Sequence, residues 1–169
     1  ANRVFGGSWG GGKATINAGV GTDLWGHNVS GIRVQNMKYA GTWDATTGSL
    51  YFVGGGRTIR LKSDGSVEVV PQPNGGSNGL LFDKQGRLVA CEAAARRITR
   101  REPDGTITVL ADSYDGKKLN SPNDLTIDSQ GRIYFSDPRY GNRDSMELRD
   151  SDGKLVEGVY RFDAPGKVE

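Results

Sequence analysis

Residues 77–92 have the sequence SNGLLFDKQGRLVACE, in which two strand-like apolar segments flank a short polar turn. Residues 122–137, PNDLTIDSQGRIYFSD, repeat this pattern at a constant offset of about 45 residues, which pairs Asn78 with Asn123. An earlier copy, YAGTWDATTGSLYFVG, begins at residue 39 and has one extra residue in its turn. Repeats of this length are typical of proteins built from similar structural units.

The residues that follow each copy also repeat. RTIRLKSDGSVEVV, RITRREPDGTITVL and VYRFDAPGKVE each predict a strand, an Asp-Gly or Pro-Gly turn and a further strand. The alanine-rich CEAAARRITR is too short to form a helix alone, and we interpret it as a strand end, a turn and a strand start. Four-stranded units of about forty to forty-five residues predict an all-β fold, a β-propeller, with a plain sandwich of short strands as the alternative.

The composition of the 169-residue chain limits the classes of function. Its net charge of +2, from 22 basic and 20 acidic residues, gives no indication of binding to nucleic acid or to an anionic membrane. No apolar stretch reaches the roughly 18 residues of a membrane span, and no signal peptide is visible, which leaves cytoplasmic and periplasmic or secreted locations open. The single cysteine, Cys91, excludes an internal disulfide, and its apolar surroundings predict a buried structural thiol.

The stretch of the chain that begins with SNGLLFDKQGRLVACE and ends with LNSPNDLTIDSQGRIYFSDPRYG resembles a known family. This is the family of gluconolactonases, senescence-marker protein (regucalcin) and luciferin-regenerating enzyme, and the similarity spans about residues 39–169. It implies a six-bladed β-propeller, of which this chain would carry about three blades. The expected units are about 39–76, 77–121 and 122–169. Residues 1–38 form a glycine-rich N-terminal segment that matches the family poorly.

The resemblance also implies a divalent cation on the propeller axis, usually calcium, with magnesium or zinc as alternatives. Asn123, in SPND, matches an axial asparagine of the family and is the expected metal ligand. Asp124 beside it is a second candidate, for a coordinated water or another cation. Hard oxygen ligands suit calcium or magnesium, and neutral amide oxygens leave the ion enough charge to polarise a bound carbonyl or water. The implied activity is hydrolysis of a sugar lactone or a related ester, a small-molecule substrate.

Five further polar residues are candidates for binding the substrate: Asn78, Glu92, Asp137, Arg139 and Tyr140. Asn78 occupies the place of Asn123 in the preceding unit. Glu92 and Asp137 are aligned at the end of the second strand of their units. Structural roles are the alternative, because Asn and Asp often cap turns through their own side chains and a residue before proline often ends a strand.

Two features depart from the family pattern. Tyr39 stands where the family has a glutamate ligand, and a neutral phenol is a poor calcium ligand. Three units would also leave the ring open, so we expect a fragment of a longer protein or a half completed by a second chain. A non-catalytic calcium- or ligand-binding propeller and an inactive fragment of a longer lactonase are therefore the alternative functions.

The third unit contains an insertion of about 16 residues within NRDSMELRDSDGKLVEG, residues 142–158. In a propeller this polar loop would lie at one face, where it could cover the axial site. A solvated surface loop is the alternative.

Overall fold

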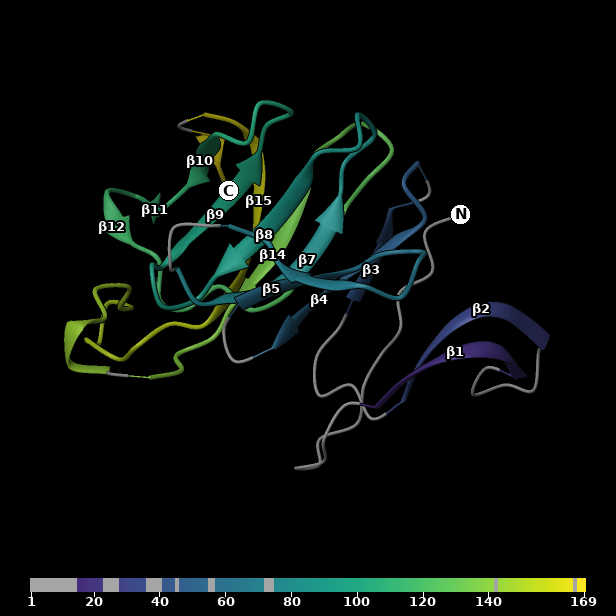
Figure 1. The fold of residues 1–169 in the computed structure, drawn as a ribbon. Helices are drawn as coiled ribbons and strands as arrows, with labels where there is room; N and C mark the ends of the chain where they lie inside the picture. Colours follow the sequence, from purple (N-terminus) through teal and green to yellow (C-terminus); the bar gives the residue numbers. More distant parts are fainter. Residues whose placement is uncertain are drawn as a thin grey trace.

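The computed structural model shows an all-β chain (Figure 1). The only helical element among the described residues is a single 3-10 turn, Arg143–Ser145. Tyr39 and much of residues 1–38 lie outside the described part. The structure describes residues 15–22, 28–35, 41–44, 46–54, 57–71, 75–141, 143–165 and 167–169, with the backbone alone for 15–22, 28–35, 41 and 54.

Three antiparallel sheets of four strands follow one another along the chain, and each keeps its strands in sequence order. The first comprises β3 (Gly41–Asp44), β4 (Ser49–Gly54), β5 (Arg57–Leu61) and β6 (Val67–Val69). The second comprises β7 (Ser77–Phe82), β8 (Leu88–Glu92), β9 (Arg97–Arg101) and β10 (Ile107–Ala111). The third comprises β13 (Leu125–Ile127), β14 (Ile133–Asp137), β15 (Gly158–Ala164) and β16 (Lys167–Val168). Each sheet has the strand order of a propeller blade, which confirms the predicted fold class.

Two short hairpins accompany the sheets. β1 (Thr15–Thr22) pairs with β2 (Asn28–Gln35), and this hairpin is drawn at the lower right of Figure 1, outside the three sheets. β11 (Ser113–Tyr114) pairs with β12 (Lys117–Lys118) between the second and third sheets in the sequence. The second hairpin leads directly into the LNSPND motif.

The turns between the first and second strands repeat together with the sequence. The side chain of Asp83 accepts the N–H groups of Gln85 and Arg87 at 3.0 and 2.9 Å, and Asp128 accepts the two equivalent bonds in the third sheet. Gly86 completes its turn with a φ of 74°, a conformation that glycine adopts without steric cost. The aspartate and glycine of each unit therefore define the same tight turn.

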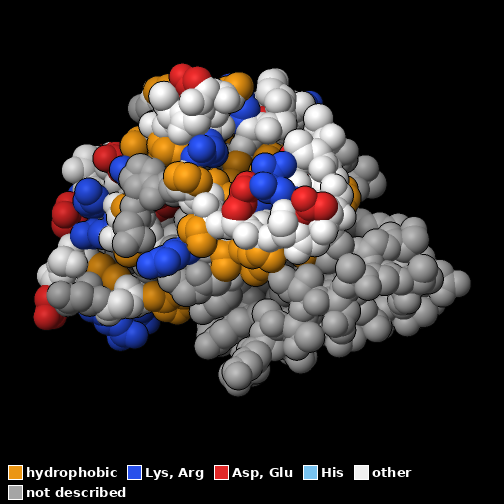
Figure 2. All heavy atoms as spheres, viewed as in Figure 1, with side chains coloured by type: hydrophobic (Ala, Val, Ile, Leu, Met, Phe, Trp, Pro, Cys, Tyr) orange, Lys and Arg blue, Asp and Glu red, His pale blue; other side chains and the backbone are white. Residues whose placement is uncertain are grey.

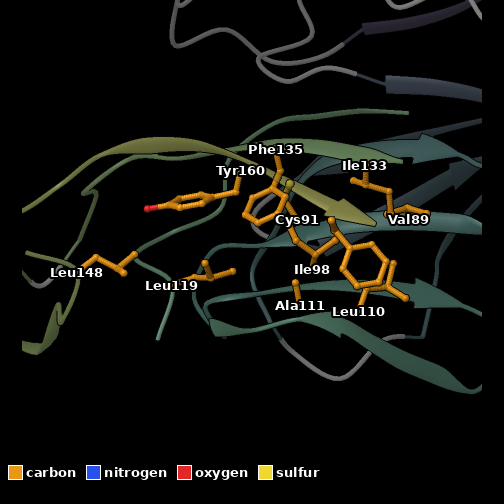
Figure 3. Packing of buried hydrophobic residues seen from close by; sticks show 11 residues of the cluster. Val89, Cys91, Ile98, Leu110, Ala111, Leu119, Ile133, Phe135, Leu148 and Tyr160 are labelled. Atoms are coloured by element: carbon orange, nitrogen blue, oxygen red, sulfur yellow. The ribbon is translucent and has the colours of Figure 1, made fainter. Parts of the chain in front are cut away.

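Adjacent sheets bury apolar side chains between them. The first and second sheets enclose a small cluster: Val53, Leu80, Leu88 and Ala90. The second and third enclose a larger one (Figure 3), which includes Val89, Ile98, Ile133, Phe135, Tyr160 and Phe162. Cys91 is fully buried in the larger cluster, which confirms the predicted structural thiol. This burial, with Asp124 and Asp137 nearby, raises the pKa of the Cys91 thiol well above its usual value.

Part of the insertion of the third sheet packs against the rest of the protein, while most of its described residues are exposed. Met146 and Leu148 are buried, and Leu148 joins one end of the larger cluster near Leu119 (Figure 3). The side chain of Glu147 accepts the N–H of Lys118 at 3.1 Å. Apolar burial and hydrogen bonding both fix this loop against the β11–β12 hairpin.

The surface agrees with the nearly balanced charge of the chain. Basic and acidic side chains are interspersed over the described surface in the view of Figure 2. Among the described residues, no helix has the length and apolar character needed to cross a bilayer.

Candidate active site at the first strands of the sheets

The first strands of the three sheets lie side by side and bring the repeated asparagines together. β7 contacts β3 and also β13. The N–H of Gly79 donates to the carbonyl oxygen of Asn123 at 2.7 Å, and Nδ2 of Asn78 donates to Oδ1 of Asn123. Two equivalent positions of the repeat therefore meet where their strands begin, as expected for units arranged around a common axis.

Gly79 allows this close approach because it has no side chain. A Cβ at this position would lie 2.8 Å from the carbonyl oxygen of Asn123, 2.8 Å from Cα of Asp124 and 2.9 Å from Oδ1 of Asp124. Its φ lies outside the left-handed region, so the requirement for glycine is one of space. Sequence reasoning placed Asn78 and Asn123 in equivalent positions but missed the role of the glycine between them.

Asn123 and Asp124 supply oxygen donors of the kind that calcium binds. Asn123 is partly buried and Asp124 is exposed, with Oδ1 of Asp124 accepting the N–H of Leu125 at 2.9 Å. No group of three or more His, Cys, Asp or Glu side chains in the described part of the chain could hold a metal by itself. Because calcium takes about six to eight oxygen ligands, these two residues fit part of a calcium site, and further ligands are needed.

Glu92 lies inside the second sheet. Its side chain is 0% exposed, and its oxygens accept bonds from Nε of Arg97 at 2.6 Å and from Oγ1 of Thr99 at 3.2 Å. A Cβ on Gly75 would lie only 2.1 Å from Oε2 of Glu92, so the backbone also closes over the carboxylate. This placement favours a structural ion pair for Glu92.

Asp137, the repeat equivalent of Glu92, is also 0% exposed but has different partners. Its two oxygens accept the backbone N–H groups of Asn120 and Ser121, each at 2.7 Å. Burial raises the pKa of Asp137 to about 6, while the two N–H bonds and the charge of Arg96 act in the opposite direction. The carboxylate is thus directed at the LNSPND segment.

Arg139 and Tyr140 follow the end of β14 and remain accessible. Nε of Arg139 lies 3.3 Å from a carboxylate oxygen of Glu157, and both side chains are partly exposed. Tyr140 is 55% exposed, and its backbone N–H donates to Oγ of Ser121 at 3.0 Å. Both residues are therefore held beside the segment that precedes Asn123, with side chains that a ligand can reach.

Sequence reasoning missed three residues whose bonds fix the segment ahead of Asn123: Asn120 and Ser121 within it, and Arg96, which contacts it. Asn120 and Ser121 belong to the LNSPND motif, and this motif was the available signal for them. Arg96 had no such signal, because it lies in the AAARR turn and adopts a φ of 57° that is unusual for arginine.

Comparisons with known proteins show what the chain is similar to. The family described as "SMP-30/Gluconolactonase/LRE-like region" matches residues 40–169. A gluconolactonase of Zymomonas mobilis subsp. mobilis is 33% identical over 122 residues, which cover 68% of this chain and 33% of that enzyme. The solved structure of a gluconolactonase from Xanthomonas campestris is 33% identical with a TM-score of 0.62, and the match covers 75% of this chain and 44% of that one. This chain thus spans less than half of the length of these two gluconolactonases.

A more distant structure shows the fold alone. A streptogramin B lyase is 18% identical with a TM-score of 0.51, over 90% of this chain and 53% of the lyase. The family match covers most of the chain, from the first sheet to the third, and it includes both asparagines that meet at the first strands. The chain therefore belongs to the SMP-30/gluconolactonase/LRE-like family.

Proposed function

We propose that the protein containing this chain hydrolyses a sugar lactone or a related ester and uses a divalent cation, calcium in the first instance. The observation that carries this proposal is the meeting of Asn78 and Asn123 at the first strands, beside the carboxylate of Asp124. Membership of a family that includes gluconolactonases supplies the substrate class.

Asn123 and Asp124 are the residues that would hold the cation. Both offer hard oxygen atoms, and the remaining ligands would come from water, from substrate or from residues outside those described. When bound, a calcium ion polarises the lactone carbonyl and lowers the pKa of a water. Asn78 orients Asn123, because its Nδ2 group bonds the amide oxygen of Asn123 and leaves the Asn123 amide few other orientations.

We assign contact with the substrate to the accessible residues near this site. Tyr140 offers an aromatic surface for the apolar face of a sugar ring, and Arg139 offers N–H donors to hydroxyl or carbonyl oxygens. Glu92 and Asp137 are fully buried and bonded within the protein, so we do not assign them to substrate.

Calcium titration combined with a lactone hydrolysis assay tests this proposal in the intact protein. Asn123→Ala should weaken calcium binding by about 100-fold or more and lower hydrolysis in parallel, because a ligand is lost. Gln130→Ala removes an exposed amide from a turn of the same sheet and should change neither quantity.

Two outcomes would contradict the proposal. Calcium binding without hydrolysis would identify a non-catalytic calcium-binding propeller. Full hydrolysis by Asn123→Ala would show that the cation, if required, is bound elsewhere.

A further inference from the structure

The two residues ahead of Pro122 give both backbone N–H groups to one buried carboxylate. Asn120 donates to Oδ2 of Asp137 and Ser121 donates to Oδ1, each at 2.7 Å. Asp137 is the last residue of β14 and has no exposed surface. Because each peptide group is planar, two short charge-assisted bonds from adjacent N–H groups fix the orientation of both peptide planes.

Arg96 holds the carbonyl groups of the same segment, residues 118–121. Its Nε donates to the carbonyl oxygen of Leu119, and its Nη2 donates to that of Lys118 at 3.3 Å. Its Nη1 also reaches the carbonyl oxygen of Ser145 in the insertion at 2.9 Å. A φ of 57° costs a residue other than glycine about 1–2 kcal/mol, and such a conformation persists where the surroundings require it. Here the strained backbone directs a guanidinium to three carbonyl groups.

The side chains of the segment make further bonds. Nδ2 of Asn120 donates to the carbonyl oxygen of Val156, ahead of β15, at 2.8 Å. Oγ of Ser121 donates to the carbonyl oxygen of Pro138 and accepts the N–H of Tyr140. The segment is thus bonded to the β8–β9 turn, to the end of β14 and to the residues ahead of β15.

The segment leads through Pro122 directly to Asn123. Proline fixes its own φ, so one of the two backbone torsions between the preceding peptide and Asn123 is restricted. The backbone of Asn123 is then held by its N–H bond to the carbonyl oxygen of Ser136 at 3.0 Å and by the bond from Gly79. The 118–121 segment is therefore one of the elements, together with Ser136 and Gly79, that hold the backbone of Asn123.

We propose that Asp137 is a positioning residue, which fixes the 118–121 segment so that the amide oxygen of Asn123 faces the candidate cation site, and that it does not contact the substrate. The parts of this proposal that concern calcium and the substrate rest on the proposed function. Arg96 acts on the same segment from its carbonyl side.

Asp137→Asn tests this role, and Asp128→Asn serves as a control for the loss of an aspartate that accepts backbone N–H groups in the same sheet. The amide of Asp137→Asn keeps one oxygen and sets an NH₂ group against a peptide N–H, so one of the two bonds is lost. Asp128 lies in the same sheet and accepts two backbone N–H groups on its Oδ1, from Gln130 and Arg132 at 2.8 and 3.0 Å, while its Oδ2 accepts Nε of Arg132 at 2.7 Å. None of these partners belongs to the 118–121 segment. Comparing the two variants distinguishes the general effect of losing an aspartate that accepts backbone N–H groups from the specific effect of loosening the 118–121 segment.

Three measurements on the intact protein decide the outcome. In Asp137→Asn, hydrogen exchange at the amides of Asn120 and Ser121 should accelerate about tenfold, because their acceptor is impaired. The dissociation constant for calcium should rise about tenfold, as for loss of a group that orients a metal ligand. The KM for a lactone at saturating calcium should stay unchanged. Asp128→Asn should leave all three at the wild-type values.

Four results would overturn the proposal. Unchanged exchange at Asn120 and Ser121 would show that Asp137 does not hold the segment. Faster exchange with unchanged calcium affinity would show that the segment does not position Asn123. A raised KM at saturating calcium, with calcium affinity unchanged, would make Asp137 a substrate-binding residue. If Asp128→Asn changed exchange and calcium affinity as much as Asp137→Asn does, Asp137 would contribute only to general stability.

A second variant covers the case in which Asp137→Asn does not fold. Arg96→Gly removes the guanidinium but relieves the strained φ, so the turn itself should fold readily. It should also accelerate exchange at Asn120 and Ser121 and weaken calcium binding, and wild-type values for both would contradict the proposal. If the wild-type protein neither binds calcium nor hydrolyses lactones, the proposed function fails, while hydrogen exchange still tests the contact between Asp137 and the segment.

Discussion

Gly79→Ala tests whether the close approach of β7 to the residues ahead of β13 maintains the candidate site. The new Cβ would lie 2.8 Å from the carbonyl oxygen of Asn123 and 2.8 Å from Cα of Asp124, which is closer than real Cβ atoms come. Because both are backbone atoms, no rotation of a side chain relieves the contact, and the two strands must separate. Overpacking of this kind costs about 1–3 kcal/mol, and a weakened hydrogen bond from Gly79 adds about 1 kcal/mol. We therefore expect a loss of about 2–4 kcal/mol in the free energy of unfolding.

Urea denaturation of the intact protein measures this loss, with Gly86→Ala as the control. A Cβ on Gly86 meets no atom within 4 Å, but the φ of +74° imposes a strain of about 1–2 kcal/mol. The control therefore carries backbone strain without steric contact. Calcium titration adds a second measurement, because only Gly79→Ala should displace Asn123 and weaken binding, by about tenfold.

The reasoning would be refuted if Gly79→Ala lost no more stability than Gly86→Ala. That result would mean that separating the two first strands costs no more than the backbone strain of the control. A large loss of stability with unchanged calcium affinity would be equally informative, because it would show that the distance between β7 and β13 does not determine the cation site.

Two further predictions follow from buried groups. The pKa of Asp137 is raised to about 6 from 3.8, so its contribution to stability is complete below pH 3.8 and is lost as the pH rises through 6, by on the order of 3 kcal/mol. The free energy of unfolding of wild type minus that of Asp137→Asn should therefore fall between pH 4 and 7, and a rise would contradict the raised pKa. Cys91 is fully buried with a raised pKa, so a thiol reagent such as dithionitrobenzoate should react with it only on unfolding. Rapid reaction under native conditions would show that the larger cluster opens readily.

The strands and turns could be predicted from the sequence because their causes are local. Alternating apolar residues define the strand faces, and Asp83 and Gly86 define a turn through bonds that span only a few residues. The AAARR stretch was correctly interpreted as a turn between β8 and β9, where its alanines could have suggested a helix. Local composition and the repeat were sufficient for these elements.

The environment of the site residues could not be predicted in the same way, because it depends on residues far apart in the sequence. Glu92 and Asp137 are equivalent in the repeat, and the sequence suggested the same role for both. In the structure Glu92 pairs with Arg97 of the next strand, whereas Asp137 accepts N–H groups from the segment ahead of β13. The difference arises because position 97 is an arginine and the equivalent position in the third sheet is Gly158, which is paired with Asp137.

This contrast indicates how a repeated framework can yield one specialised site. Where the repeat is kept, it produces the geometry, since Asn78 and Asn123 meet because equivalent positions converge. Where the repeat is broken, the carboxylate at the end of the second strand lacks the arginine that pairs with it in the second sheet. With glycine opposite Asp137 in place of an arginine, its carboxylate has no cation directly opposite it on β15 and accepts the N–H groups of the 118–121 segment instead. The insertion, which only the third sheet contains, then packs against the same segment through Glu147. Both departures from the repeat thus act on the residues that lead to Asn123, which is why the proposed positioning role of Asp137 concerns this segment.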